Sequence, residues 1–166
     1  MNFFEYSEPV NAVERFGIRD DEEGKQAKEM PAFVDYTEKA LWNAEIVSDN
    51  RNDFNFIAVD KQIPYFDEKG NQNSLCDAIV WTPNTIVFIE LKTGAKSWLT
   101  EAIAQLKSTI NFFQTCEDIQ KFKYKKAYAC NKQHPNFHYQ QSHVMQAFVK
   151  KTGVVLRTEK EIKGIK

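Results

Sequence analysis

The segment that most restricts the possible folds is residues 74–94, SLCDAIVWTPNTIVFIELKTG. Its two halves are rich in Ile, Val and Phe, which predicts strands at about 76–82 and 85–93. Between them, Pro83 and Asn84 suit the two central positions of a type I turn, so the strands are expected to form a hairpin. The second strand is apolar on both faces over most of its length, which is typical of a strand in the middle of a sheet.

The rest of the chain predicts an α/β fold with a central mixed β-sheet flanked by helices. Apolar residues recur at helical spacing along residues 97–113, which gives the clearest helix. Further helices are expected at 7–17, 35–48 and 139–151, and further strands at 53–63, 122–130 and 153–158. A chain of 166 residues can bury one core. We therefore expect a single domain with three parts: an N-terminal helix and acidic loop (1–33), a core (34–130), and a C-terminal helix and strand (131–166).

Three ionisable side chains interrupt the apolar hairpin. A turn that is symmetric about residues 83–84 places Asp77 directly opposite Glu90, with their Cβ atoms about 4.5–5.5 Å apart. Lys92 points to the same face as Glu90 because alternate residues of a strand share a face. Two facing carboxylates repel each other, and near an apolar interior such charges are normally paired or bound to a metal. The pattern thus favours a Mg²⁺ or Mn²⁺ site, although a plain salt bridge from Lys92 at an exposed sheet end would also fit.

These residues resemble the signature of the PD-(D/E)XK nuclease superfamily, which contains many restriction endonucleases: Asp77, twelve residues, then Glu90-Leu91-Lys92. Cys76 stands where the name of the superfamily has proline. The resemblance implies a restriction-endonuclease-like core and metal-dependent hydrolysis of a phosphodiester in DNA, or alternatively in RNA. It also implies that Asp77, Glu90 and the carbonyl of Leu91 hold the metal, and that Lys92 acts on the attacking water.

Two further catalytic candidates follow from the same resemblance. Members of the superfamily often add a glutamate from the preceding helix, and within 35–48 we favour Glu38 over Glu45. Gln105, on the helix after the hairpin, matches a polar residue that RecB-like members use to position the site or the DNA. Either residue could instead be an ordinary surface position.

The charge is distributed unevenly along the chain. Residues 119–166 carry 11 bases and 2 acids, whereas residues 1–72 carry 8 bases and 16 acids. A basic segment can supply phosphate contacts, although it can also be a solvated face. The expected substrate-binding residues are Lys96, Lys125, Lys126 and Lys132. A homodimer is a further expectation, because nucleases of this class frequently act as dimers.

The N-terminal residues lack the basic and apolar regions of a signal peptide, and no apolar run is long enough to span a bilayer. We therefore expect a cytoplasmic protein with no membrane contact and free thiols at Cys76, Cys116 and Cys130. Two other functions remain open. One is a non-catalytic binding or regulatory module with a nuclease-like fold. The other is a zinc site, whose candidate ligands are Cys130, His134, His138 and His143.

Overall fold

The computed structural model describes residues 1–21, 29–94, 96–137 and 142–166. Its largest element is a mixed six-stranded sheet in the order β1-β5-β6-β7-β8-β9. The neighbours from β1 to β7 are antiparallel, whereas β7, β8 and β9 run parallel to one another. The strands are β1 (Glu8–Pro9), β5 (Asn55–Ala58), β6 (Ala78–Trp81), β7 (Thr85–Lys92), β8 (Tyr124–Asn131) and β9 (Val155–Arg157).

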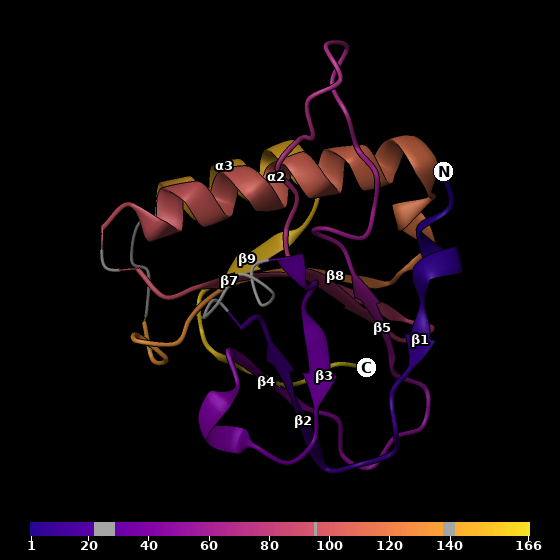
Figure 1. Cartoon of the computed structure of the whole chain (residues 1–166), viewed down its shortest axis with the longest axis vertical. Coiled ribbons are helices and arrows are strands. Elements are labelled where there is room, and N and C mark those ends of the chain that lie inside the picture. Colours follow the sequence, from indigo (N-terminus) through magenta and orange to yellow (C-terminus); the bar gives the residue numbers. More distant parts are fainter. Residues whose placement is uncertain (22–28, 95, 138–141) are drawn as a thin grey trace.

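Two α-helices cover one face of this sheet (Figure 1). They are α2 (Trp98–Cys116) and α3 (Ser142–Thr152), and short 3-10 turns lie at η1 (Phe3–Tyr6) and η3 (Ile119–Lys121). The apolar face of α2 buries Leu106, Ile110 and Phe113 against the sheet, as its helical spacing predicts. No helix among the described residues is long and apolar enough to cross a bilayer.

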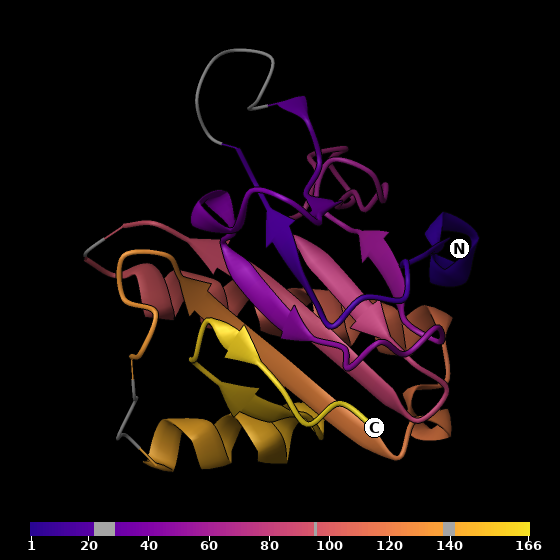
Figure 2. The same cartoon turned by 90° about the horizontal axis from the view of Figure 1, so that it is seen from below.

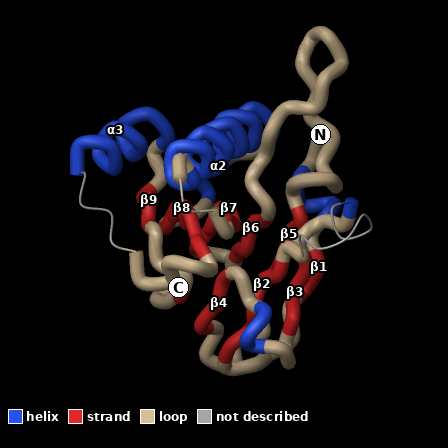
Figure 3. The backbone as a smooth tube through the Cα atoms, turned by 60° about the vertical axis from the view of Figure 1, so that its left-hand side comes forward, coloured by secondary structure: helices blue, strands red, loops and turns tan. Residues whose placement is uncertain are grey.

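A second sheet of four strands, ordered β10-β4-β2-β3, covers the other face. Figure 3 shows the resulting layers, with the two helices on one side of the large sheet and β2, β3 and β4 on the other. The expectation that helices flank the sheet is therefore right for one face and wrong for the other. The strands of the second sheet are β2 (Arg15–Arg19), β3 (Phe33–Asp35), β4 (Ala44–Val47) and β10 (Glu161–Ile162).

The predicted helices at 7–17 and 35–48 are wrong: β1 of the large sheet and strands of the second sheet lie there instead. Along β4 the side chains alternate between buried and half-buried, so that Ala44 and Ile46 enter the core between the sheets. In β2, Gly17 lies so close to Trp42 that a Cβ atom there would come within 2.0 Å of the indole ring. The apolar spacing of both segments was compatible with a helix, but pairing between distant strands buries more of their apolar surface. Only the short turn η2 (Lys39–Leu41) is helical here.

The β6–β7 hairpin has the predicted register. Ala78 pairs with Ile89, and Trp81 pairs with Ile86. The pairing continues to the turn, where the amide of Thr82 donates to the carbonyl of Thr85 at 2.9 Å. The strands expected at 53–63, 122–130 and 153–158 and the helix at 97–113 are also confirmed, with shifted ends. The expected 139–151 helix is present as α3 from residue 142, and residues 139–141 lie outside the described residues.

Candidate active site

Asp77 and Glu90 lie on neighbouring strands and point to the helix-covered face of the large sheet. Asp77 directly precedes β6, and the hairpin register carries it to the position opposite Glu90 of β7. Side chains two residues along each strand, Ile79 and Phe88, pack into the core beneath the helices, which fixes the direction of both acids. Asp77 is 8% exposed and Glu90 is 1% exposed. The hairpin thus holds two carboxyl groups inside the protein.

Burial changes the proton affinity of both groups. Burial raises the pKa of Asp77 to about 7, against the opposing effect of a hydrogen bond from the Leu91 amide. Burial and the charge of Asp77 raise the pKa of Glu90 well above its ordinary value, although nearby Lys92 acts in the other direction. Each carboxylate is therefore costly to ionise unless a positive charge joins it.

Lys92 provides one such charge. Its Nζ lies 2.9 Å from Glu90 Oε1. Burial lowers the pKa of Lys92, but the charges of Glu90 and Asp77 outweigh this effect, and the pKa is raised overall. Lys92 also donates to Gln105 Oε1 on α2, and Gln105 Nε2 in turn donates to the carbonyl of Leu75 at 3.3 Å. Gln105 therefore joins the lysine to the segment that leads into β6.

The ion pair does not satisfy the whole of Glu90. Among the described residues, Glu90 Oε2 is the one buried side-chain oxygen or nitrogen that has no hydrogen-bond partner. An unpaired buried carboxylate oxygen is unfavourable unless a further group binds it. Asp77 Oδ2 accepts from the amide of Leu91 at 2.7 Å, so that the backbone of Leu91 faces the same edge of β7 as Asp77. A cation placed here would find hard oxygen donors, the kind that Mg²⁺ prefers.

The carboxylates alone do not enclose an ion. No group of three or more His, Cys, Asp or Glu side chains within the described ranges could hold a metal. Because Glu90 Oε2 has no partner among the described residues, the oxygen donors of Asp77, Glu90 and Leu91 would fit a cation that takes its remaining ligands from water or substrate, which is common for Mg²⁺.

Two acids outside the expected set act on this site. Asp20 follows β2 and Asp60 follows β5, and their charges raise the pKa of Asp77 further. Lys61 lies beside both, with its Nζ 3.8 Å from Asp20 Oδ1 and 4.0 Å from Asp60 Oδ2. Asp60 lay inside the strand predicted at 53–63, and only the shorter observed β5, which ends at Ala58, places it beyond a strand end. Asp20 was missed because residues 18–31 were predicted to be an acidic loop, whereas β2 continues to Arg19 and carries Asp20 to the end of a strand.

Glu38 and Glu45 do not lie on a helix next to the site. Glu38 is an exposed residue at the start of η2, and its amide donates to Asp35 Oδ2. Glu45 is part of β4 and forms ion pairs with Arg15 and Lys39. Since the expected helix is absent, the reason for choosing Glu38 as a catalytic residue disappears.

The four lysines expected to bind substrate fall into two groups. Lys132 directly follows β8, and its amide donates to the carbonyl of Lys92. Lys96 is exposed between β7 and α2. These two lie near the carboxylate end of β7. Lys125 and Lys126 begin β8 beside Ile86 and Val87, toward the other end of the strand. The ammonium of Lys125 donates to the carbonyl of Phe122 at 3.0 Å, so it is partly occupied within the protein.

The candidate zinc ligands are only partly described. Cys130 is buried, and its thiol donates to the carbonyl of Glu159. His134 and His143 are both exposed, on the segment after β8 and on α3. His138 lies outside the described residues. The described part of the proposed zinc site therefore contains a thiol directed into the protein and two histidines on its surface. The three cysteines are free, as expected.

No protein-family model, curated protein or solved structure matches this chain.

Proposed function

We propose that this protein is a metal-dependent phosphodiester hydrolase of the PD-(D/E)XK type, with a restriction-endonuclease-like core, acting on DNA. The observation that carries the proposal is the buried pair Asp77 and Glu90, which the hairpin register places opposite each other beside Lys92. Two adjacent buried acids with an unpaired oxygen have no evident structural benefit. Buried carboxylates are normally paired with a positive charge, and these two are suited to bind a metal cation.

In this proposal Asp77, Glu90 and the Leu91 carbonyl hold Mg²⁺ or Mn²⁺. When bound, such an ion lowers the pKa of a water and offsets the charge of the phosphate. Lys92 is protonated at neutral pH because its pKa is raised, so it acts as a hydrogen-bond donor and a positive charge toward the water and the phosphate. Gln105 keeps the ammonium of Lys92 in place through its own bond to the Leu75 carbonyl.

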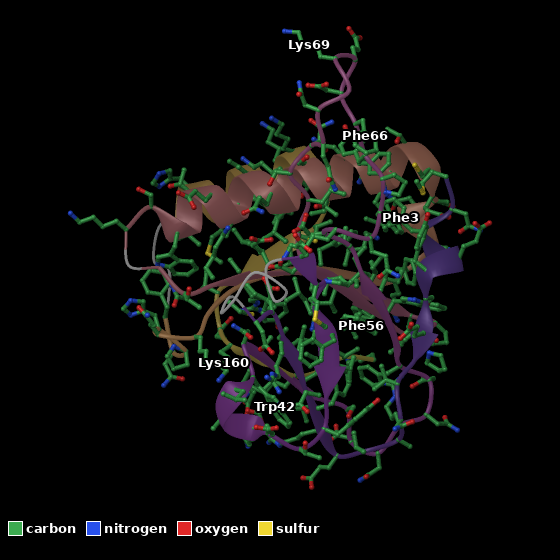
Figure 4. The ribbon with its side chains drawn as sticks, viewed as in Figure 1. Phe3, Trp42, Phe56, Phe66, Lys69 and Lys160 are labelled. Carbon is green, nitrogen blue, oxygen red and sulfur yellow. The ribbon has the colours of Figure 1, made fainter. Side chains whose placement is uncertain are left out.

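Cleavage of labelled single-stranded, double-stranded and branched DNA tests the proposal. We expect the wild-type protein to cleave at least one substrate with Mg²⁺ or Mn²⁺ and none with EDTA. Glu90→Gln and Lys92→Met should each lower the rate at least about 100-fold, the usual effect of removing an electrostatic catalytic group. Lys69→Met is the control, because Lys69 is exposed at the tip of the loop that rises above α2 (Figure 4).

The outcomes separate the two readings of the site. Equal cleavage by wild type and Lys92→Met would indicate a contaminating nuclease and reject the proposal. No cleavage of any substrate by wild type, together with unchanged thermal stability on adding Mg²⁺ or Mn²⁺, would instead favour the non-catalytic module.

A further inference from the structure

A basic surface lies along the free edge of the large sheet, at the side opposite β1. In Figure 2 the C-terminal segments, from the gold α3 to the yellow end of the chain, gather on one side of the molecule. They include most of the basic residues of 119–166, where 11 bases accompany 2 acids. We call the part around the edge strand β9 the β9 surface. It is defined by Lys126, Lys150, Arg157, Lys163 and Lys166.

Arg157 joins two hollows of this surface. The first has a volume of 420 Å³ between α3 and β9, and the second has a volume of 400 Å³ between β8, β9 and the segment after β9. Arg157 lines both, and it is exposed. The first hollow is also lined by Val149, Lys150 and Val155, and the second by Lys126, Tyr128, Glu159, Glu161 and Lys163.

Arg157 differs from the other arginines in that it forms no ion pair with any acid in the part of the chain that the structure describes. Each of the other three forms ion pairs at 2.9 Å or less: Arg15 with Glu45 and Glu161, Arg19 with Asp21, and Arg51 with Asp53. Within the described residues, no ion pair is formed by Arg157, Lys126 or Lys150. A guanidinium group that is exposed and unpaired can bind a phosphate through two parallel hydrogen bonds.

The two acids of the second hollow do not cancel these charges. Glu161 is paired with Arg15 at 2.8 Å, from outside the hollow, and with Lys163 at 3.6 Å inside it, so its charge offsets that of Lys163 only in part. Glu159 accepts a hydrogen bond from the amide of Thr158. Lys126 is half-buried and its ammonium donates to the carbonyl of Gly164 at 3.2 Å, which still leaves donors for an anion. Burial together with the charges of Arg157 and Lys166 lowers its pKa. The local balance is positive, and an anion would relieve the repulsion between these cations.

We propose that the β9 surface binds the phosphate backbone of a nucleic acid. Its cations come from β8, α3, β9 and the C-terminal segment, and such a spread suits a polyanion with repeated charges better than a single small anion. The surface is separate from the carboxylates, because Glu90 points toward the helices whereas Lys126 and Tyr128, in register with β9, lie on the other face of the sheet. The inference does not depend on hydrolysis at Asp77 and Glu90.

Binding of a short fluorescein-labelled DNA duplex, measured by anisotropy over a series of salt concentrations in EDTA, tests this inference. EDTA prevents any metal-dependent cleavage. We expect the double variant Lys126→Gln/Arg157→Gln to bind roughly tenfold more weakly. We also expect its slope of log affinity against log salt to be smaller by about 2, because each phosphate contact contributes about 0.9.

Two controls keep the result interpretable. Lys69→Gln removes an exposed charge far from β9 and should bind as wild type does, and thermal unfolding should show that the double variant is folded. Unchanged affinity and slope in the double variant would overturn the inference. Unchanged DNA binding with an altered oligomeric state by sedimentation would also overturn it and assign the surface to a second copy of the chain. Binding without cleavage would reject only the hydrolase.

Discussion

Asp77 is hydrogen-bonded to the strand that carries Glu90, one residue beyond it: Asp77 Oδ2 accepts from the amide of Leu91 at 2.7 Å. This bond fixes the carboxyl group at the end of the hairpin, where β6 no longer pairs with β7. The second acid, Glu90, is held on the same face and is paired with Lys92 on one oxygen only. A pair of metal ligands requires rigid positioning of this kind.

Stability without metal should fall as the pH rises from about 4 to about 7. The pKa of Asp77 is about 7 in the folded protein and 3.8 ordinarily, so the folded state binds more protons between these values. Raising the pH through this window removes protons that stabilise the folded state. The loss of folding stability is complete above pH 7. Urea unfolding at several pH values with EDTA measures the effect. A stability that increases steadily over this range would contradict it.

Asp77→Asn should stabilise the metal-free protein at pH 8 by up to about 4 kcal/mol, since the pKa of Asp77 is raised from 3.8 to about 7 and a difference of one in pKa corresponds to about 1.4 kcal/mol. The amide oxygen of asparagine can still accept from the Leu91 amide, so the hairpin contact remains. The same variant should lose the increase in melting temperature that Mg²⁺ or Mn²⁺ gives to wild type. Differential scanning calorimetry with and without metal tests both parts. An undiminished metal effect would exclude Asp77 as a ligand.

Lys92→Met should destabilise the metal-free protein by about 2–3 kcal/mol at pH 8, because Glu90 then stays buried without its cation. The loss should be smaller at pH 5, where Glu90 takes up a proton more readily as a result of its raised pKa. Urea titrations at the two pH values give the comparison. An equal loss at both would show that the packing of the lysine side chain, rather than its charge, is responsible.

Gln105→Met should lower cleavage about 10–100-fold, because a poorly positioned lysine reduces the rate without removing the chemistry. Its matched control is Gln114→Met. Gln114 is also on α2, and its Nε2 donates to the carbonyl of Thr152 at 3.0 Å, away from the site. Each variant should lose about 1 kcal/mol of stability for its hydrogen bonds. Equal rates in the two variants would mean that Gln105 has only a structural role.

Gly17→Ala should destabilise the protein by at least about 3 kcal/mol through overpacking. The new Cβ would lie 2.0 Å from an indole atom of Trp42, and a buried ring cannot move away freely. Gly94→Ala is the control, because no atom lies within 4 Å of a Cβ built there. Its stability should stay within about 0.5 kcal/mol of wild type. Thermal unfolding of the two variants measures the difference. Equal stability of the two would contradict a close contact between Gly17 and Trp42.

The hairpin and its acids could be predicted from the sequence because the information is local. Strand residues flank a two-residue turn, and the period of two then determines which side chains face each other. Helix α2 was equally clear, since its apolar residues repeat over 19 residues and no other element fits that spacing. From these local patterns alone, Asp77, Glu90 and Lys92 could be placed on one face of the sheet, whereas Gln105 was a candidate only through the resemblance to the nuclease superfamily.

Tertiary structure decided what covers the other face of the sheet and which distant charges reach the site. Residues 15–19 and 44–47 have apolar spacings that a helix or a strand could use, and only their pairing with each other makes the strand favourable. That pairing brings Asp20 toward Asp77 and takes Glu38 out of a helix. The same physical reason applies to Arg157: a sequence shows a charge, but only the folded chain shows whether an opposite charge lies beside it.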